Sequence, residues 1–178
     1  MMGEELFFVA IVPPQEVQNE ITSFKELIAD RFQSKHALKS PPHITLHMPF
    51  RWKEKKFGQL AKVLLQLNKD LQPFEVQLKD FDFFEPRVVF VDVMESQALL
   101  RLQKDVVDCF RKELKLDNGN YKGQGFHPHV TIGFRDLKKP MFFEAKKEFE
   151  QRAFQAKFMA EELTLLKHDG QKWEISAF

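Results

Sequence analysis

The residues best suited to chemistry lie in two short copies of one pattern. His43-Ile44-Thr45-Leu46 and His129-Val130-Thr131-Ile132 each place a threonine two positions after a histidine, with apolar residues between and after. On a β-strand, successive side chains point to opposite faces. Each copy therefore predicts one face that packs into a core and one face that carries an imidazole and a hydroxyl. Two such strands side by side would present both pairs to one ligand.

Paired imidazoles and hydroxyls suit acid–base chemistry at phosphorus. An unperturbed imidazole titrates at about pH 6.5, so one histidine can donate a proton while another accepts one. A threonine hydroxyl can donate a hydrogen bond to a phosphoryl oxygen and stabilise the charge of the transition state. We therefore expect four catalytic residues in a site for phosphodiester chemistry: His43, Thr45, His129 and Thr131.

Helices and strands follow the same order in both halves of the chain. The apolar run 6–12 predicts a strand, and apolar residues over 17–32 recur at helical spacing. Further helices are expected over 57–67, 96–114 and 141–153, and further strands over 73–78, 88–93, 154–159, 162–166 and 172–178. Asp169-Gly170 predicts a hairpin turn. The halves 1–86 and 87–178 thus repeat one order, which indicates a single α+β domain of two similar lobes.

Composition limits the classes of partner. The chain has 178 residues and a formal net charge of +1, with 27 basic and 26 acidic residues, which disfavours broad binding to DNA or long RNA. The lone Cys109 cannot form an intramolecular disulfide, so a reducing compartment is favoured. No apolar run approaches the roughly 20 residues of a membrane span. We expect a cytoplasmic protein without a membrane partner, and the sequence gives no sign of a protein partner.

The two motifs resemble the paired signature of a known superfamily. Residues 41–46, Pro-Pro-His-Ile-Thr-Leu, and 127–134, His-Pro-His-Val-Thr-Ile-Gly-Phe, resemble the two-histidine phosphoesterases, and the branch of 2′-5′ RNA ligases and cyclic nucleotide phosphodiesterases in particular. The resemblance covers essentially the whole chain in length, motif spacing and element order. It implies a bilobal, pseudo-twofold α+β fold in which two mainly antiparallel sheets line a central cleft and helices pack outside.

The same resemblance implies a reaction. It points to opening of 2′,3′-cyclic phosphates or cleavage of 2′-5′-linked nucleotides and RNA ends, without a metal or other cofactor. It casts His129 as the base that activates water and His43 as the acid that protonates the leaving oxygen. Two alternatives stay open: a module that binds a nucleotide or an RNA end without turnover, and a 2′-5′ RNA ligase that uses the same residues.

Residues near the motifs are candidates for substrate binding. His47 shares the predicted strand face of His43 and Thr45, and His127 lies two positions before the second motif. The other substrate-binding candidates are Phe50, Arg51, Tyr121, Lys122 and Arg135, with Arg87 as a further possible phosphate contact. Phe50 could stack on a base, whereas strand alternation predicts that Phe134 points away from the cleft.

A metal site is the competing interpretation of the extra histidines. His47 and His127 together with the two motif histidines could ligate a metal ion. However, no cysteine lies nearby, and neither motif contains an acidic residue. The sequence therefore favours histidines that flank the pocket over histidines that hold a metal.

Overall fold

The computed structural model describes residues 3–119 and 125–178. The elements run in the order β1 (Glu4–Ile11), α1 (Gln15–Phe32), η1 (His36–Lys39), β2 (Ile44–Lys53), η2 (Glu54–Lys56), α2 (Phe57–Asp70), β3 (Phe74–Phe84), β4 (Val88–Val93), α3 (Gln97–Cys109), the π-helical η3 (Phe110–Leu114), β5 (His129–Gly133), α4 (Lys139–Phe149), β6 (Gln155–Ala160), β7 (Thr164–His168) and β8 (Trp173–Ser176).

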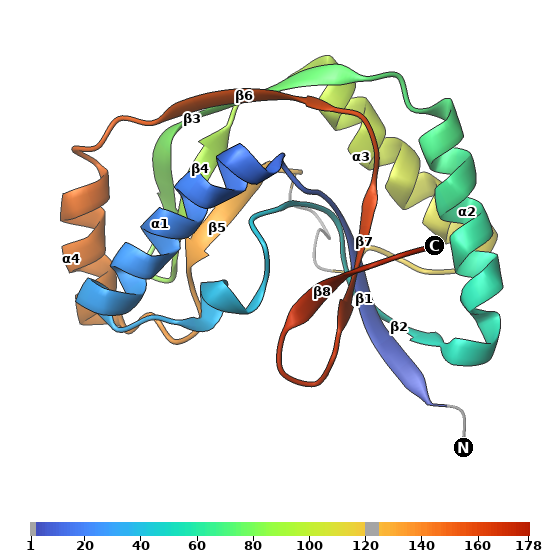
Figure 1. Cartoon of the computed structure of the whole chain (residues 1–178), viewed down its shortest axis with the longest axis horizontal. Helices are drawn as coiled ribbons and strands as arrows, with labels where there is room; N and C mark the ends of the chain where they lie inside the picture. Colours follow the sequence, from blue (N-terminus) through green and yellow to red (C-terminus); the bar gives the residue numbers. More distant parts are fainter. Residues whose placement is uncertain (1–2, 120–124) are drawn as a thin grey trace.

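Two four-stranded antiparallel sheets form the centre of the molecule, with strand orders β2-β1-β7-β8 and β5-β4-β3-β6 (Figure 1). The motif strands β2 and β5 each occupy an edge, beside the first strand of their own half. The third strand of each sheet comes from the other half of the chain, because β3 pairs with β4 and β7 pairs with β1. The predicted α+β fold with two antiparallel sheets is confirmed. Each sheet, however, draws strands from both halves of the chain, so 1–86 and 87–178 are interleaved.

The first helix of each half likewise packs against the motif strand of the other half. α1 packs against β5 and α4, whereas α3 packs against β2, and α2 contacts η3 (Figure 1). A close approach marks the contact of α1 with β5: a Cβ atom at Gly133 would lie 3.2 Å from the side chain of Ile28. Helix α3 begins where the sequence predicts, since the hydroxyl of Ser96 accepts a hydrogen bond from the Leu99 amide at 3.2 Å.

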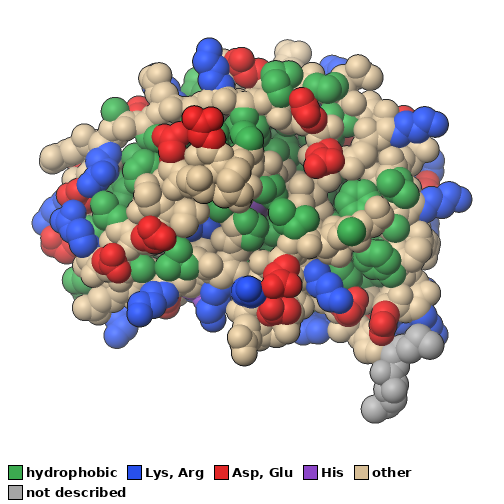
Figure 2. Space-filling model, viewed as in Figure 1, with side chains coloured by type: hydrophobic (Ala, Val, Ile, Leu, Met, Phe, Trp, Pro, Cys, Tyr) green, Lys and Arg blue, Asp and Glu red, His purple; other side chains and the backbone are tan. Residues whose placement is uncertain are grey.

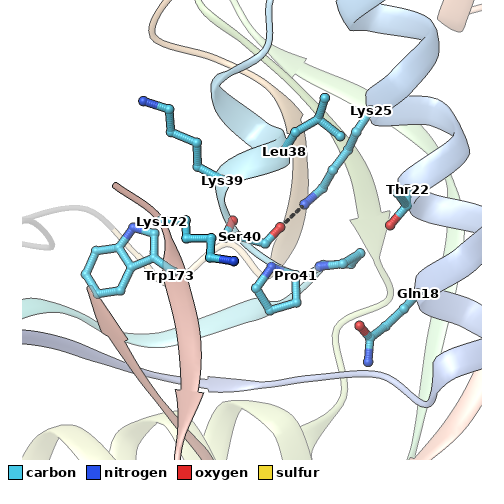
Figure 3. Close-up of a pocket in the computed structure, with 10 residues that line it drawn as sticks. Gln18, Thr22, Lys25, Leu38, Lys39, Ser40, Pro41, Lys172 and Trp173 are labelled. Atoms are coloured by element: carbon cyan, nitrogen blue, oxygen red, sulfur yellow. Dashed lines mark hydrogen bonds between the residues drawn. The ribbon is translucent and has the colours of Figure 1, made fainter. Parts of the chain in front are cut away.

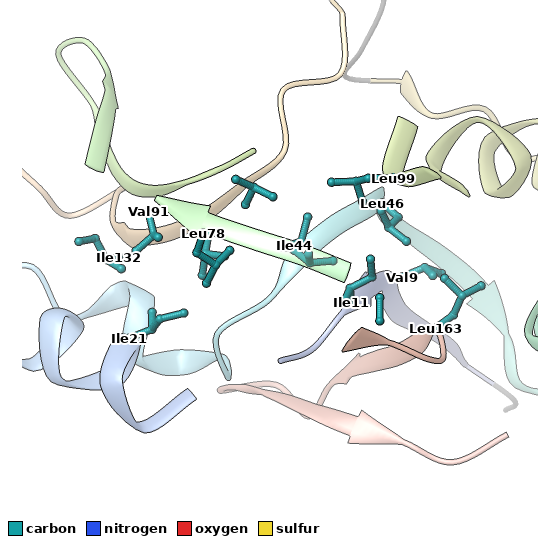
Figure 4. Packing of buried hydrophobic residues seen from close by; sticks show 14 of the residues in the cluster. Val9, Ile11, Ile21, Ile44, Leu46, Leu78, Val91, Leu99, Ile132 and Leu163 are labelled. Carbon is teal, nitrogen blue, oxygen red and sulfur yellow. The ribbon is translucent and has the colours of Figure 1, made fainter. Parts of the chain in front are cut away.

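The apolar faces of both motif strands lie in one continuous core. Ile44 and Leu46 of β2 pack with Val9 and Ile11 of β1, and the same cluster includes Ile132 of β5 (Figure 4). Ile44, Leu46 and Ile132 are fully buried. The predicted alternation in the first positions of each motif is therefore confirmed, and burial of one face fixes which way the other face points.

The surface reflects the balanced composition. Figure 2 shows acidic and basic side chains interspersed over the visible face, with hydrophobic side chains between them. Within the described residues, no helix combines the length and the apolar character needed to cross a bilayer.

Candidate active site

A cavity of about 340 Å³ lies between the two motif strands. These strands, β2 and β5, belong to different sheets and contact each other. His43 and Thr45 line it from one side, and His129 and Thr131 line it from the other. Its volume falls within the range of small-molecule sites, roughly 300–1,000 Å³. The fold therefore brings together both histidines and both threonines.

Both motif histidines are held in the same way. Nδ1 of His43 lies 2.7 Å from the carbonyl oxygen of Pro41, and Nδ1 of His129 lies 2.7 Å from the carbonyl oxygen of His127. A carbonyl oxygen only accepts, so each Nδ1 must carry the proton and donate it. In the neutral ring, Nε2 is then the nitrogen with a free lone pair. Both rings thus keep Nε2 as the atom that can exchange a proton.

An aromatic ring of the neighbouring strand supports each histidine. The His43 ring lies 4.7 Å from the Phe8 ring of β1, and the His129 ring lies 5.1 Å from the Phe90 ring of β4. Phe8 and Phe90 are both buried. Because β1 and β4 occupy equivalent places in their sheets, the internal repeat extends to the packing that orients the catalytic candidates.

The environment keeps both imidazoles neutral at pH 7. Burial lowers the pKa of His43 to about 4; the hydrogen bond to Pro41 opposes this, while the charges of Lys25 and His129 add to it. Burial also lowers the pKa of His129. An anionic ligand between the rings would favour their charged forms and raise both pKa values. Protonation of either ring is therefore coupled to the arrival of negative charge in the cavity.

Lys25 of α1 supports the segment that carries His43. Its side chain is 1% exposed, and Nζ donates 2.9 Å hydrogen bonds to the carbonyl oxygens of Ala37 and Ser40; Figure 3 shows the second of these. Burial lowers the pKa of Lys25 to about 7. Ser40 immediately precedes Pro41, whose own carbonyl holds His43. The sequence interpretation missed Lys25, although it lies four residues after Ile21 on the buried face of the helix.

The prediction that His47 lines the cleft is wrong. Adjacent residues Ala10 and Val9 of β1 pair with Thr45 and His47, so Leu46 is an extra residue in β2 and forms a β-bulge. The bulge reverses the alternation, and His47 becomes 1% exposed in the core. Its ring lies 4.8 Å from that of Phe110, and its Nδ1 donates to the Met48 carbonyl at 2.8 Å.

Three other candidates also lie away from the cavity walls. Phe50 is buried and packs against Phe7 and Phe110, because a second irregularity in the pairing, between Phe7 and Val9, returns the strand to its original alternation. Arg51 is exposed on the same strand. His127 is exposed, and its Nε2 lies 3.4 Å from a carboxylate oxygen of Asp92, while its carbonyl accepts the hydrogen bond from His129.

Beyond the second motif, the chain turns sooner than strand alternation assumes. Strand β5 ends at Gly133, and Arg135 adopts a left-handed backbone with φ of 58°. Phe134 and Arg135 therefore both line the cavity, which corrects the expectation for Phe134 and agrees with the one for Arg135. Tyr121 and Lys122 lie outside the described residues.

Several cavity-lining residues had no chemical signal in the sequence. Phe8 and Trp173 pack edge to face at 4.6 Å and form an apolar wall on the first sheet. His36 lies edge-on to the Phe134 ring at 5.0 Å. The other such residues are Ala37, Ser40, Met48, Pro49 and Val88. Of these, only Phe8 could have been found, because it alternates with Phe7 on a predicted strand.

No metal cluster accompanies these groups. Among residues 3–119 and 125–178, no three His, Cys, Asp or Glu side chains come together as a metal site would require.

Sequence comparison identifies the family. The model of the 2′-5′ RNA ligase superfamily matches residues 13–172, and the chain belongs to this superfamily, that of the two-histidine phosphoesterases. A protein of Geobacillus kaustophilus named "Putative phosphoesterase GK0864" is 31% identical over 134 residues, which cover 72% of this chain and 68% of that protein. The "Putative phosphoesterase OB1230" of Oceanobacillus iheyensis is 24% identical over 94% of this chain and 92% of its own length.

Solved structures share the fold at low identity. Escherichia coli LigT complexed with 3′-AMP gives a TM-score of 0.70 at 17% identity, over 99% of this chain and 96% of LigT. TT0787 of Thermus thermophilus gives a TM-score of 0.67 at 20% identity, over 97% of this chain and 95% of that protein. The similarity spans both sheets of this chain, so the whole domain shares the LigT-like fold.

Proposed function

We propose that this chain is a phosphodiesterase that opens 2′,3′-cyclic phosphates or cleaves 2′-5′-linked nucleotides and RNA ends, with His43, Thr45, His129 and Thr131 as its catalytic residues. One observation carries the proposal. Both histidines donate Nδ1–H to a backbone carbonyl, which leaves two Nε2 atoms and two threonine hydroxyls for one shared cavity.

Each histidine ring carries out one of the two proton transfers. Following the superfamily resemblance, Nε2 of His129 takes a proton from the attacking water, and Nε2 of His43 gives a proton to the departing ribose oxygen. The threonine hydroxyls donate to the non-bridging phosphoryl oxygens, where negative charge grows. Because both histidine pKa values are lowered, the acid gains its proton together with the phosphate rather than before it.

Small nucleotides are the proposed ligands, and no metal or cofactor takes part. LigT, whose fold this chain shares, was solved with 3′-AMP and with ATP. Trp173, the partly exposed member of the apolar wall, offers an aromatic ring for a base. We also place the protein in the cytoplasm, because its lone Cys109 cannot form an intramolecular disulfide.

The direct test is turnover without metal. The purified protein is incubated in EDTA with the four 2′,3′-cyclic mononucleotides and with short 2′-5′ oligoadenylates, and products are separated by chromatography. We expect a nucleoside monophosphate from at least one substrate. Folded protein that turns over none of them would reject the proposal.

Ligation is the second candidate, because the matching family is described by it. The same residues would open the 2′,3′-cyclic phosphate with the 5′-hydroxyl of the other half as nucleophile in place of water, so that a 2′-5′ bond forms as the bond from phosphorus to the 3′ oxygen breaks. Incubation with tRNA halves, one ending in a 2′,3′-cyclic phosphate, measures the direction. Joined product that reaches a constant ratio to the halves would support ligation, whereas complete hydrolysis would exclude it under those conditions.

A further inference from the structure

A second depression adjoins the catalytic cavity. It has a volume of about 560 Å³ and shares Val88, Phe134 and Arg135 with the cavity as common walls. Its remaining walls are Pro86, Arg87, Leu137 and Lys139. We call this depression the basic groove. Because three side chains face both spaces, a ligand seated between the two histidines could continue directly into the groove.

The basic groove has a concentrated positive charge in a chain that is otherwise balanced. Arg87, Arg135 and Lys139 line it, and no acidic side chain does. Across the described residues, none of these three cations forms an ion pair, whereas Glu85, the acidic neighbour of Pro86, is paired with Lys146. Unpaired cations gathered in a concave surface attract anions and lower the free energy of a bound phosphate.

An aromatic ring separates the groove from the cavity. The Phe134 ring is partly exposed, and the guanidinium of Arg135 lies over it at 5.6 Å from the ring centre. Sites for single-stranded nucleic acids combine cations that follow the backbone with aromatic rings on which bases stack. The groove has both features within one residue of each other, at the place where a strand would leave the cavity.

We propose that the basic groove binds the phosphodiester backbone of a single-stranded RNA whose 3′ end occupies the catalytic cavity. The inference rests on the proposed function and adds a second binding site beside its cavity. A 2′,3′-cyclic phosphate is the 3′ terminus of an RNA, so the rest of the strand can extend only in the 5′ direction. The next phosphate then meets Arg87 and Lys139, and the penultimate base stacks on Phe134.

The test compares two substrates that present the same end to the histidines. One is 2′,3′-cyclic AMP, and the other is a tetranucleotide that ends in the same cyclic adenylate. In about 50 mM salt we expect kcat/KM to be at least tenfold higher for the tetranucleotide. This advantage shrinks as salt rises, because each phosphate contact releases a counterion. Equal kcat/KM for both substrates would overturn the inference.

The double variant R87Q/K139Q tests the groove itself. We expect its kcat/KM for the tetranucleotide to fall at least tenfold more than that for the mononucleotide, with a salt slope smaller by about two, one for each lost contact. The matched control K79Q/K157Q removes two exposed lysines from the paired strands β3 and β6, and neither lysine lines the cavity or the groove. Parallel losses for both substrates, or an equal effect in the control, would contradict the proposal.

Binding separates failure of the groove from failure of the proposed function. Fluorescence anisotropy with a labelled tetranucleotide 3′-phosphate measures affinity without turnover. If neither substrate is cleaved, the proposed function fails. In that case, tighter binding to the wild type than to R87Q/K139Q still supports the groove, and identical binding to both overturns it.

Discussion

The hydroxyl of Ser34 donates a 2.6 Å hydrogen bond to the carboxylate of Asp136, although 102 positions separate them in the chain. The backbone amides of Lys35 and His36 donate to the same carboxylate at 2.9 and 3.3 Å. Asp136 thus ties the segment before the first motif to the segment after the second. Its neighbours Arg135 and His36 both line the cavity, so this tie fixes one wall of the site.

We therefore predict that Asp136→Asn weakens both the fold and substrate binding. An asparagine keeps one accepting oxygen but turns an amide donor toward the donors of residues 34–36. The expected loss is about 1–2 kcal/mol of unfolding free energy, together with a several-fold rise in KM and a smaller change in kcat. Urea denaturation and steady-state kinetics measure these effects.

Asp30→Asn is the control for Asp136→Asn, because Asp30 is an exposed residue of α1. It loses the same charge without touching the cavity. If both variants unfold at the same urea concentration as the wild type, the tie does not stabilise the site.

The roles of His43 as acid and His129 as base can be tested by changing the leaving group of the substrate. His43→Ala and His129→Ala should each lower turnover of a cyclic nucleotide by roughly 10²–10⁴-fold, the usual contribution of an acid or a base. A p-nitrophenyl phosphodiester needs no protonation of its leaving group. We therefore expect His43→Ala to regain near-wild-type activity on that ester and His129→Ala to remain impaired.

Two results would contradict this assignment. Recovery in His129→Ala alone would exchange the roles of acid and base. Equal impairment of both variants on both substrates, in proteins that unfold at the wild-type temperature, would argue against a pair of separate proton-transfer groups.

The pH dependence follows from the lowered pKa values of the pair. In the proposed mechanism the active form carries one proton on the pair His43 and His129, and burial lowers the pKa of both rings below the usual value. Above about pH 6.5 the free protein therefore carries this proton only rarely. We predict that kcat/KM rises about tenfold for each unit of pH decrease until the higher pKa of the pair is reached. A constant kcat/KM from about pH 5 to 9 would contradict paired proton transfer.

Replacement of Lys25 should shift the dependence of kcat/KM on pH. Its charge is among the causes that lower the pKa of His43, so Lys25→Met is expected to raise this pKa and to move the acid limb of kcat/KM to higher pH. NMR titration of the His43 ring measures the shift. Lys62→Met, at an exposed position of α2, is the control. A His43 pKa that stays constant or falls in Lys25→Met would contradict the electrostatic role.

His47 should behave as a core residue rather than as a catalytic one. His47→Ala removes a buried ring that packs against Phe50 and Phe110, which predicts a loss of about 2–4 kcal/mol of unfolding free energy. The effect on kcat should stay below tenfold. His47→Phe fills the volume and loses only the hydrogen bond to Met48, so its destabilisation should be smaller. A loss of turnover comparable with that of His43→Ala, in stable protein, would return His47 to the active site.

Local sequence determined the residues that a regular strand could place. Ile44 and Leu46 point into the core and Thr45 points into the cavity, because a strand with one buried face has a fixed alternation. Helix α3 likewise starts at its serine cap. These features depend on neighbours one to four positions away, so they are visible in a single sequence.

Long-range contacts decided the rest. The bulge at Leu46 arises from the pairing of β2 with β1, and it alone moves His47 into the core. The Asp136 tie and the aromatic wall of Phe8 and Trp173 join segments far apart in the chain, and the buried Lys25 bonds carbonyls 12 and 15 positions away. The stabilising energy of each of these contacts depends on a partner residue that spacing along the sequence cannot identify. The sequence therefore established the paired motifs, and only the folded chain determined the surroundings that orient their side chains, lower the pKa values of their histidines and place all four residues at one cavity.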